Sequence, residues 1–329
     1  MTAAIDLSKI RKILVISTTH IGDTILTTPA ISLLRERFPS SHISVMVGPN
    51  VVPLFTGSHT VNQVFAYDKK VSWVEKVKFV FELRKQKFDF VLDLRNTAIP
   101  VFIRPKYRNS LFLDRSSIQM RQKHLNQLSF IFPIDGPSEN NFNFFTIEEQ
   151  ARALEKLPNS AVNDFVVIGP GAGSDLKRWT ISGFADVVEY CFKKDKAVVL
   201  VGWGRESELG LELERRASKL IVNLIGVLTL RESAGLISRA SLVVANDSAI
   251  MHLAHELNRP TVSIFGPTDE KKYGQVGANR RTVRLKLDCT PCEVAQCLIE
   301  RRICLDDLPA TSVIQACEEL LNHVNHAAN

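Results

Sequence analysis

The sequence predicts an α/β protein built from two doubly wound domains in tandem. Short apolar runs, of the kind that buried parallel strands require, alternate with longer segments of helical periodicity in both halves of the chain. The chain has 329 residues, which suits two domains of about 150 residues each. A turn-rich polar stretch, residues 133–143, separates the halves. We therefore expect a first domain over residues 1–150, a second over residues 151–311, and a last helix within residues 312–329.

The first half opens with a buried strand that runs into a polar turn. The strands expected in this half are residues 10–17, 42–47, 61–67 and 88–92, and the helices are residues 24–38, 53–55 and 73–86. Gly22 and Asp23 lie in the turn after the first strand, at the sheet edge where ligands of such folds bind. An aspartate there suits a catalytic base, but Asp is also a favoured helix cap, so both interpretations of Asp23 stay open.

The second half repeats this alternation. Its expected strands are residues 165–168, 197–201, 221–223, 242–245 and 261–265, and its expected helices are residues 147–156, 182–194, 208–220 and 229–238, with one more between the last two strands. Residues 242–268 therefore form a βαβ unit with a polar turn, Asn246 to Ser248, at the start of its helix. Free N–H groups at a helix start favour an anion, so we place the active cleft at this turn and at Gly266 to Thr268.

A glycine-rich loop, residues 169–174, follows the first strand of the second half, and Lys177 lies just beyond it. Backbone N–H groups in such a loop favour a phosphate, and a lysine adds a cation; a solvated lysine is the alternative. Glu206 suits a ribose diol, as acidic residues do in dinucleotide-binding folds. His252 lies one helical turn after Ser248, where it serves either a phosphate or the core.

Charge is unevenly spread along the chain. The formal net charge is +6, yet residues 69–123 alone hold fourteen Lys and Arg against five acidic residues. A locally basic surface indicates an anionic partner, whether a phosphorylated glycan, an anionic lipid or nucleic acid, although a solvated face with scattered lysines fits as well. No apolar run approaches the roughly 20 residues that span a bilayer, and residues 1–10 lack a signal-peptide core. We expect a cytoplasmic protein.

With these motifs in place, the chain resembles glycosyltransferase family 9, the ADP-heptose-dependent heptosyltransferases that build the inner core of lipopolysaccharide. The similarity runs over most of the chain and is carried by Gly22-Asp23 with Pro29-Ala30, the glycine-rich loop with Lys177-Arg178-Trp179, Gly204 with Glu206, Asn246-Asp247-Ser248 with His252, and Phe265-Gly266-Pro267-Thr268. The resemblance implies a GT-B fold, in which two Rossmann-like doubly wound domains face each other across a cleft. It also implies that the first domain binds the acceptor and the second the sugar nucleotide. In many members a final helix crosses back to the first domain, and residues 312–326 are the candidate for it.

The same resemblance implies an inverting glycosyltransferase that moves heptose from ADP-heptose to an inner-core lipopolysaccharide acceptor in one displacement. Asp23 matches the proposed catalytic base and Lys177 the diphosphate-binding lysine. The donor-binding candidates are Gly171, Gly173, Ser174, Lys177, Glu206, Leu228, Asp247, Ser248 and His252, and the acceptor-binding candidates are Arg95, Arg104, Lys106 and Arg121. We expect no cofactor to be required for catalysis, an anionic lipid-linked acceptor, peripheral contact with the cytoplasmic face of the inner membrane, and no nucleic acid partner.

Four of the six cysteines lie close together in the sequence. Cys289, Cys292, Cys297 and Cys304 have the spacing C-x2-C-x4-C-x6-C. Thiols so spaced in a cytosolic protein indicate a metal more than disulfides. A structural zinc or iron ion and reduced cysteines that pack a loop both stay open.

Two other functions remain as alternatives. One is a family 9-like transferase that acts on a protein or on another glycan. The other is a non-catalytic nucleic-acid-binding protein whose four cysteines form a zinc module. Against the second, the chain has no interleaved aromatic and basic residues of the kind that RNA-binding sheets carry, and no recognition helix follows the cysteines.

Overall fold

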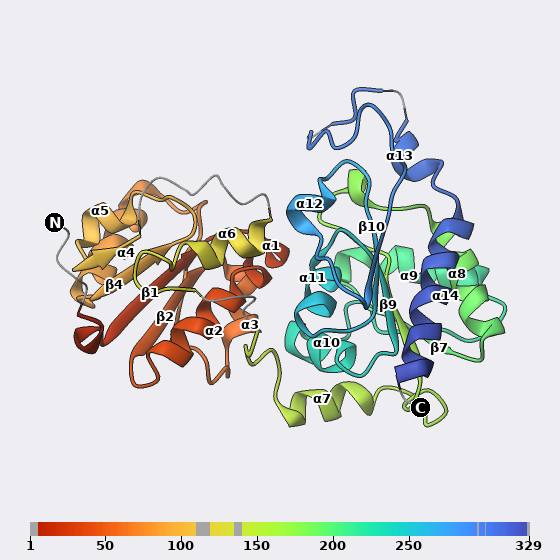
Figure 1. Cartoon of the computed structure of the whole chain (residues 1–329), viewed down its shortest axis with the longest axis horizontal. Helices are drawn as coiled ribbons and strands as arrows, with labels where there is room; N and C mark the ends of the chain where they lie inside the picture. The colour runs from red at the N-terminus through yellow and green to blue at the C-terminus, as the bar shows by residue number, and fades with distance from the viewer. Residues whose placement is uncertain (1–5, 110–118, 135–139, 295, 300, 328–329) are drawn as a thin grey trace. The chain divides into compact units, whose positions relative to one another are not determined.

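The computed structural model describes residues 6–109, 119–134, 140–294, 296–299 and 301–327. The chain divides into two compact units, residues 1–144 and 145–329 (Figure 1). Each unit contains one sheet in which every strand pair is parallel, with helices connecting the strands. The expected fold class, two doubly wound α/β domains in tandem, is confirmed.

The first unit is wound around its first strand. Its elements, in chain order, are η1 (Leu7–Lys9), β1 (Lys12–Ser17), α1 (Ile21–Ile25), α2 (Thr28–Arg37), β2 (His42–Val47), η2 (Pro49–Val51), α3 (Val52–Phe55), β3 (Gln63–Ala66), α4 (Trp73–Lys85), β4 (Phe90–Asp93), α5 (Ile99–Ile103), β5 (Tyr107–Arg108) and α6 (Met120–Asn126). The strand order is β3-β2-β1-β4-β5. Because the chain moves outward from β1 to β3 and then returns to β4, the winding direction reverses between β1 and β4.

The sheet of the first unit is covered on both faces, as its apolar strands predict. Leu14 and Ile16 of β1 pack in one cluster with Leu83 of α4 and Ile99 of α5. The two residues of β1 that point the other way, Ile13 and Val15, are also fully buried. A strand that is apolar at every position therefore reflects helices on both sides of it.

The helix expected over residues 24–38 is two helices. α1 ends at Ile25 and α2 begins at Thr28, with Pro29 at the start of α2. Proline has no N–H to continue the α-helical ladder and is favoured in the first turn of a helix. The hydroxyl of Thr27 donates to the carbonyl of Thr24 and that of Thr28 to the carbonyl of Ile25, both at 2.7 Å, which satisfies the carbonyl groups at the break.

The second unit has a larger sheet of the same kind. Its elements are α7 (Ile147–Leu154), β6 (Phe165–Gly169), η3 (Asp175–Lys177), α8 (Ile181–Lys193), β7 (Ala197–Leu200), η4 (Gly204–Glu206), α9 (Ser207–Arg216), β8 (Val222–Asn223), α10 (Leu230–Ile237), β9 (Leu242–Asn246), α11 (Ala249–Glu256), β10 (Thr261–Ile264), α12 (Glu270–Tyr273), β11 (Arg280–Val283), α13 (Ile303–Asp306) and α14 (Ala310–Ala327). The strand order is β11-β10-β9-β6-β7-β8, so the winding reverses between β6 and β9.

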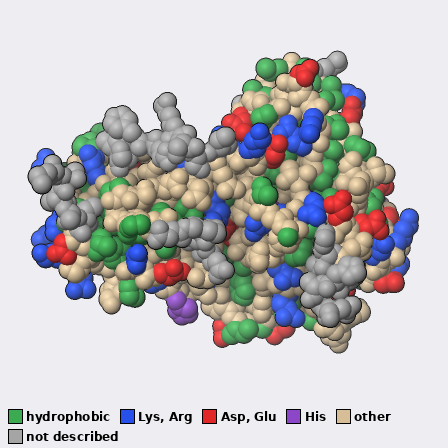
Figure 2. Space-filling view, viewed as in Figure 1, with side chains coloured by type: hydrophobic (Ala, Val, Ile, Leu, Met, Phe, Trp, Pro, Cys, Tyr) green, Lys and Arg blue, Asp and Glu red, His purple; other side chains and the backbone are tan. Residues whose placement is uncertain are grey.

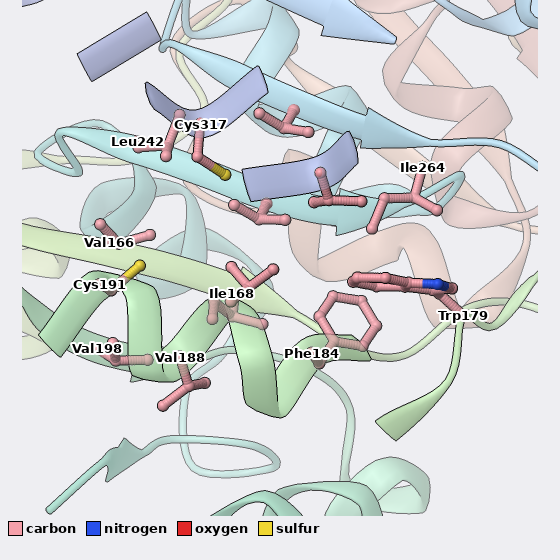
Figure 3. Packing of buried hydrophobic residues seen from close by; sticks show 14 of the residues in the cluster. Val166, Ile168, Trp179, Phe184, Val188, Cys191, Val198, Leu242, Ile264 and Cys317 are labelled. Carbon is pink, nitrogen blue, oxygen red and sulfur yellow. The ribbon is translucent and has the colours of Figure 1, made fainter. Parts of the chain in front are cut away.

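One face of this second sheet is covered by α8 and α14, which enclose an apolar core (Figure 3). The rings of Trp179 and Phe184 meet edge to face with centroids 5.1 Å apart. Cys191 and Cys317 are fully buried in the same core. Burial raises the pKa of Cys191 to about 12, so this thiol stays protonated and acts as a small apolar side chain.

The division between the units lies slightly before residue 150. α7 packs against α10, where Arg231 Nε donates to both carboxylate oxygens of Glu149 at 2.9 Å. A side chain at Gly235 would lie 2.8 Å from the Cα of Gln150, so this glycine allows the two helices to approach closely. At the other end of the chain, α14 packs against α8, β10 and β11 of the second unit. No helix in the described part of the chain is both long and apolar enough to cross a membrane.

Candidate active site

The winding of the second sheet reverses between β6 and β9. Helices leave β6 and β9 in opposite directions, and in open parallel sheets ligands bind beyond the carboxyl ends of such strands. The glycine-rich loop, residues 169–174, follows β6. The polar turn formed by Asn246, Asp247 and Ser248 ends β9 and leads into α11. The structure therefore brings together the two motifs on which the sequence interpretation depends.

Asn246 ties these motifs to each other. Its Nδ2 donates to the carbonyl of Pro170 at 2.8 Å, and its Oδ1 accepts from the backbone N–H of Trp179 at 2.9 Å. The side chain is fully buried. Asn246 thus fixes both ends of the segment that carries the glycine-rich loop and Lys177, which is a structural role that the sequence interpretation did not assign.

The side chains of Lys177, Asp247 and His252 lie together at the end of β9. Lys177 Nζ donates to Asp247 Oδ2 at 2.7 Å, and the side chains are 31% and 4% exposed. Nε2 of the buried His252 lies 3.8 Å from Asp247 Oδ1. The ammonium also lies 5.6 Å from the ring centroid of Tyr273. Lys177 is therefore not merely solvated, because one carboxylate and one aromatic face already position its charge.

Two hydroxyl groups beside this cluster lack partners. Ser248 Oγ and Thr268 Oγ1 are buried, and neither makes a hydrogen bond within the described part of the chain. Ser248 is the N-cap of α11, yet its side chain does not cap the helix. Buried polar groups are normally paired, so two orphans at the ends of β9 and β10 indicate a polar ligand.

Glu206 lies at the same edge, beside the glycine-rich loop. Its carboxylate accepts the backbone N–H of Trp203 at 2.9 Å and is 3% exposed. Burial raises the pKa of Glu206, which the hydrogen bond from Trp203 and the nearby Arg205 partly offset. A Cβ at Gly171 would lie 2.0 Å from the Glu206 carboxyl carbon. Gly171 is therefore required for this carboxylate to reach the loop.

The other donor-binding candidates lie at this edge as well. Gly173 and Ser174 are exposed on the loop after β6, and Ser174 Oγ accepts the backbone N–H of Leu176 at 3.2 Å. Leu228 is 7% exposed and lies in the loop between β8 and α10. All nine candidates therefore follow a strand at the carboxyl edge of the second sheet.

In the first unit, Asp23 lies just after β1, at the point where the winding reverses. It is the third residue of α1, whose N-cap is His20, so the interpretation of Asp23 as the helix cap is wrong. Its side chain is half-buried. Within the described residues, the carboxylate makes no hydrogen bond or ion pair, so it is available to a ligand.

A buried histidine near Asp23 was missed by the sequence interpretation. Nδ1 of His124, on α6, lies 3.1 Å from the carbonyl of Leu26 and must carry the proton there, since a carbonyl only accepts. Burial lowers the pKa of His124 to about 4, against a smaller opposing effect of Asp23. The imidazole is therefore neutral at pH 7 and keeps Nε2 as an acceptor. A single histidine in a basic helix gives no signal of this position in the sequence.

The four acceptor-binding candidates do not share one edge of the first sheet. Arg95 follows β4 at the carboxyl edge. Lys106 precedes β5, and Tyr107 of β5 pairs with Phe90 at the start of β4, so Lys106 lies at the amino edge with Arg104 shortly before it. Arg121 lies on α6, the helix that contacts Leu26 between α1 and α2. Arg104 and Lys106 therefore lie at the opposite edge of the sheet from Asp23, because α5 carries the chain back across the sheet.

All four clustered cysteines line one small cavity of about 20 Å³. Cys304 is buried, Cys289 is exposed, and Cys292 and Cys297 are half-buried. Among the described residues, however, no three His, Cys, Asp or Glu side chains lie close enough together to hold a metal ion. The four thiols therefore face one cavity but lie too far apart to coordinate one metal ion together.

Comparisons with known proteins agree with these motifs. The family described as glycosyltransferase family 9 (heptosyltransferase) matches residues 77–302. Lipopolysaccharide heptosyltransferase 3 of Escherichia coli is 27% identical over 277 residues, which cover 75% of this chain and 81% of that protein. Lipooligosaccharide heptosyltransferase 2 of Campylobacter jejuni is 25% identical over 327 residues, covering 95% and 99%. The solved structure of E. coli ADP-heptose lipopolysaccharide heptosyltransferase II has a TM-score of 0.77 at 22% identity, covering 95% and 99%. The fold is shared over nearly the whole length of both chains.

Proposed function

Since the chain belongs to glycosyltransferase family 9, the heptosyltransferases, we propose that it transfers heptose from ADP-heptose to the inner core of lipopolysaccharide. It is a glycosyltransferase with the GT-B fold, and the family resemblance carried by its motifs is confirmed. No cofactor is generally needed for catalysis in this family. This proposal includes the identity of the donor and the acceptor, the contact with a membrane, and the roles of the individual residues.

The observation that carries the proposal is the polar cluster where the winding of the second sheet reverses. A positioned ammonium on Lys177 and two unpaired hydroxyls, on Ser248 and Thr268, lie beside the N-terminus of α11. A diphosphate offers acceptor oxygens to each of these donors, and free N–H groups at a helix start favour its negative charge. Glu206, in the segment that follows β7, accepts hydrogen bonds from ribose hydroxyls.

Asp247 exchanges one partner for another when the donor binds. It is buried and bonded to Lys177 before a donor arrives. When the diphosphate attracts Lys177, the carboxylate loses part of that partner, and a buried unpaired carboxylate is costly. Hydroxyl groups of the donor's heptose donate to Asp247 instead. The exchange requires a sugar nucleotide, because a nucleotide alone has no heptose hydroxyl to offer.

The reaction is a single displacement at the anomeric carbon of the heptose. The Asp23 carboxylate takes the proton of the acceptor hydroxyl, whose oxygen forms the new bond to that carbon. The bond from the anomeric carbon to the β-phosphate oxygen breaks, and its electron pair leaves with ADP. Lys177, Ser248, Thr268 and the N-terminus of α11 stabilise the charge that develops on ADP, as preorganised donors do elsewhere.

The acceptor is a lipid-linked, anionic saccharide. Arg95 lies at the same edge of the first sheet as Asp23 and is exposed, so it is the best placed of the four candidates to contact an anionic group of the acceptor. Arg104 and Lys106, at the other edge, serve long-range attraction to an anionic membrane surface rather than contact at Asp23. The enzyme acts at the cytoplasmic face of the inner membrane.

Nucleotide selectivity tests the donor assignment. We expect isothermal titration to detect binding of ADP, and neither UDP nor GDP to bind within about tenfold of it, because a difference of 1.4 kcal/mol in base recognition already separates affinities tenfold. Equal affinity for the three nucleotides would leave a diphosphate site but remove the ADP-linked donor. Binding of none of them would contradict the sugar-nucleotide site itself.

We also propose that Cys289, Cys292, Cys297 and Cys304 hold a structural zinc or iron ion. The support is that all four line one cavity and that thiolates are preferred ligands of both metals. Binding requires the thiols to move inward from the positions described above. The ion would then tie the segment before α13 to the loop after β10, where the backbone N–H of Cys292 donates to the carbonyl of Pro267 at 3.0 Å.

Metal analysis of the purified chain tests this second proposal. We expect one equivalent of metal, its loss in Cys292→Ser and Cys304→Ser, and its retention in Cys191→Ala, which changes a buried cysteine outside the cluster. Removal of the metal should lower Tm by roughly 10 °C, since losing a ligand held at about 1,000 times its Kd costs about 4 kcal/mol. Metal-free protein with an unchanged Tm would show that the thiols only pack the loop.

A further inference from the structure

The first unit has a large cavity, and Arg95 is the only one of its described lining residues to which the proposed function gives a role. The cavity has a volume of about 800 Å³ and lies where α4 and α5 meet the carboxyl edge of the sheet. These two helices lie side by side (Figure 1). Its apolar lining includes Trp73, Val77 and Phe81 of α4 and Phe102 of α5. Pockets for small ligands typically measure roughly 300–1,000 Å³, so this one has room for a ligand.

The apolar side chains around this cavity are unusually exposed. Leu83 is the only buried residue of α4, although the helix contains seven apolar residues. Trp73 is 77% exposed, Phe81 59% and Phe102 56%. Val74 and Val101, at 61% and 50%, extend the exposed apolar surface beyond the cavity itself. An apolar surface of this kind marks an interaction site, because leaving it in water is unfavourable.

The charged residues described around the cavity are all cationic. Lys69, Lys76, Arg84 and Arg95 line it, and no acidic residue is among the described residues that do. The acids of α4 are engaged locally: Glu75 completes a capping box with Ser72, and Glu82 pairs with Lys85. The face of the first unit drawn in Figure 2 shows hydrophobic and basic side chains next to one another, with acidic side chains also present on it. The partner of this surface must therefore be apolar and anionic at once.

We infer that α4 and α5 dock on a bilayer that contains anionic phospholipid. The cavity takes an acyl chain, Lys69, Lys76 and Arg84 contact lipid phosphates, and Trp73 lies at the level of the head groups, where tryptophan is favoured. A bilayer fits better than a single lipid ligand because Val74 and Val101 extend the apolar surface outside the cavity. This inference rests on the proposed function, because the enzyme needs to dock on a bilayer only if its acceptor is embedded in one. Arg95, which the proposal assigns to the acceptor, lines the same cavity.

Sedimentation of the full chain with vesicles tests the inference. One set of vesicles is phosphatidylcholine alone, and the other also contains phosphatidylglycerol. We expect binding only to the anionic vesicles, weakening as salt increases. The double variant Lys76→Glu/Arg84→Glu should lower the bound-to-free ratio at least about tenfold, since each basic residue near such a surface contributes about 1 kcal/mol. The double variant Trp73→Ser/Phe81→Ser should lower this ratio as much, because it removes two apolar side chains from contact with the bilayer. Two matched controls in the second unit should stay within about twofold: Lys193→Glu, which reverses an exposed charge on α8, and Leu220→Ser, which removes an apolar side chain that is 84% exposed.

Tryptophan fluorescence reports the depth of contact. The emission of the wild type should shift to shorter wavelength on anionic vesicles, and this shift should disappear in Trp73→Phe, since the chain's other tryptophans lie in the second unit. Three results would overturn the inference: no vesicle binding by the wild type, binding by both α4 double variants that equals that of the wild type, or a dimer that Trp73→Ser/Phe81→Ser converts to a monomer, which would assign the surface to a second copy.

Titration with ADP in the same preparations separates this inference from the proposed function. Variants that keep both the ADP affinity and the thermal unfolding curve of the wild type are folded in both units, so their loss of vesicle binding supports docking through α4. Wild type that binds ADP but no vesicles overturns the docking surface and leaves the transferase. Wild type that binds anionic vesicles through α4 but no ADP supports the docking surface and contradicts the transferase.

Discussion

Replacement of Asp23 by asparagine is expected to lower kcat for heptose transfer by roughly 10²- to 10⁴-fold, the usual contribution of a general base. The substitution removes a negative charge without changing the shape of the side chain. Since the carboxylate makes no hydrogen bond or ion pair within the described residues, the fold of the first unit loses little. Affinity for ADP, which binds the second unit, should not change.

Asp23 also lies in the first turn of α1, and the two possible roles of its charge differ greatly in magnitude. An acidic residue in that turn stabilises a helix by about 0.3–1 kcal/mol through its dipole. If this were its only role, Asp23→Asn would lower Tm slightly and leave kcat within a few-fold of the wild type. Steady-state transfer assays and thermal melts on the same samples therefore distinguish the roles.

Two further variants complete this comparison. Asp23→Glu keeps the carboxylate but moves it by one methylene, so its kcat should lie between those of the wild type and the asparagine variant. Glu36→Gln removes a carboxylate from α2, where it accepts a hydrogen bond from Asn141 at 2.9 Å, and it should transfer heptose normally. Near-normal kcat in Asp23→Asn would refute the assignment of Asp23 as the base.

Replacement of Lys177 by alanine is expected to weaken ADP binding by about 1–3 kcal/mol, the usual loss for a charge-assisted hydrogen bond, and to lower kcat as well. Part of the loss comes from Asp247. With Lys177 absent, that buried carboxylate has lost its ion pair and repels the incoming diphosphate. Isothermal titration with ADP measures the effect directly.

A double-mutant cycle separates the two contributions. In the Lys177→Ala background, Asp247→Asn should recover part of the lost ADP affinity, because it removes the repulsion. Lys196→Ala is a matched control: this lysine pairs with Asp164 in the same unit, but both precede their strands and lie at the opposite edge of the sheet. Unchanged ADP affinity in Lys177→Ala would exclude this lysine from the donor site.

The core strands could be predicted from the sequence because helices cover both faces of the sheets. Such strands are apolar at nearly every position, as residues 13–16 and 242–245 are, and His42–Val47 was predicted with its observed bounds. Of the four edge strands that the structure describes, β3 and β8 were also predicted, but β5 and β11 carry no such signal. β11 has the sequence Arg-Arg-Thr-Val and β5 has two residues, so neither could be distinguished from a loop. The break between α1 and α2 was not predicted from the apolar periodicity, which continues across it. Pro29 was the available signal, because proline lacks the N–H that the helical hydrogen-bond ladder requires.

The site could be predicted only where its residues lie in segments that follow strands. Asp247 follows β9 directly, Lys177 and Glu206 lie in the segments that lead from β6 and β7 to the next α-helix, and the parallel sheet brings these segments to one edge. Asn246 was recognised as polar, but its clamp on Pro170 and Trp179 depends on the distance between segments that are more than sixty residues apart. The position of Lys106 at the amino edge follows from the path of α5, which its sequence does not reveal. His124 acquires its fixed proton only through burial against Leu26.

The most direct measurement is the transfer reaction itself. The purified chain would be incubated with ADP-heptose and with lipopolysaccharide acceptor that lacks inner-core heptose, and the products would be analysed by mass spectrometry. The account predicts an acceptor heavier by one heptose, release of one ADP for each heptose transferred, and inversion of the anomeric configuration. If ADP-heptose stays intact with this acceptor while a different glycan or a protein receives the sugar, the assignment to the lipopolysaccharide inner core is contradicted. If no acceptor receives heptose, the transferase assignment itself is contradicted.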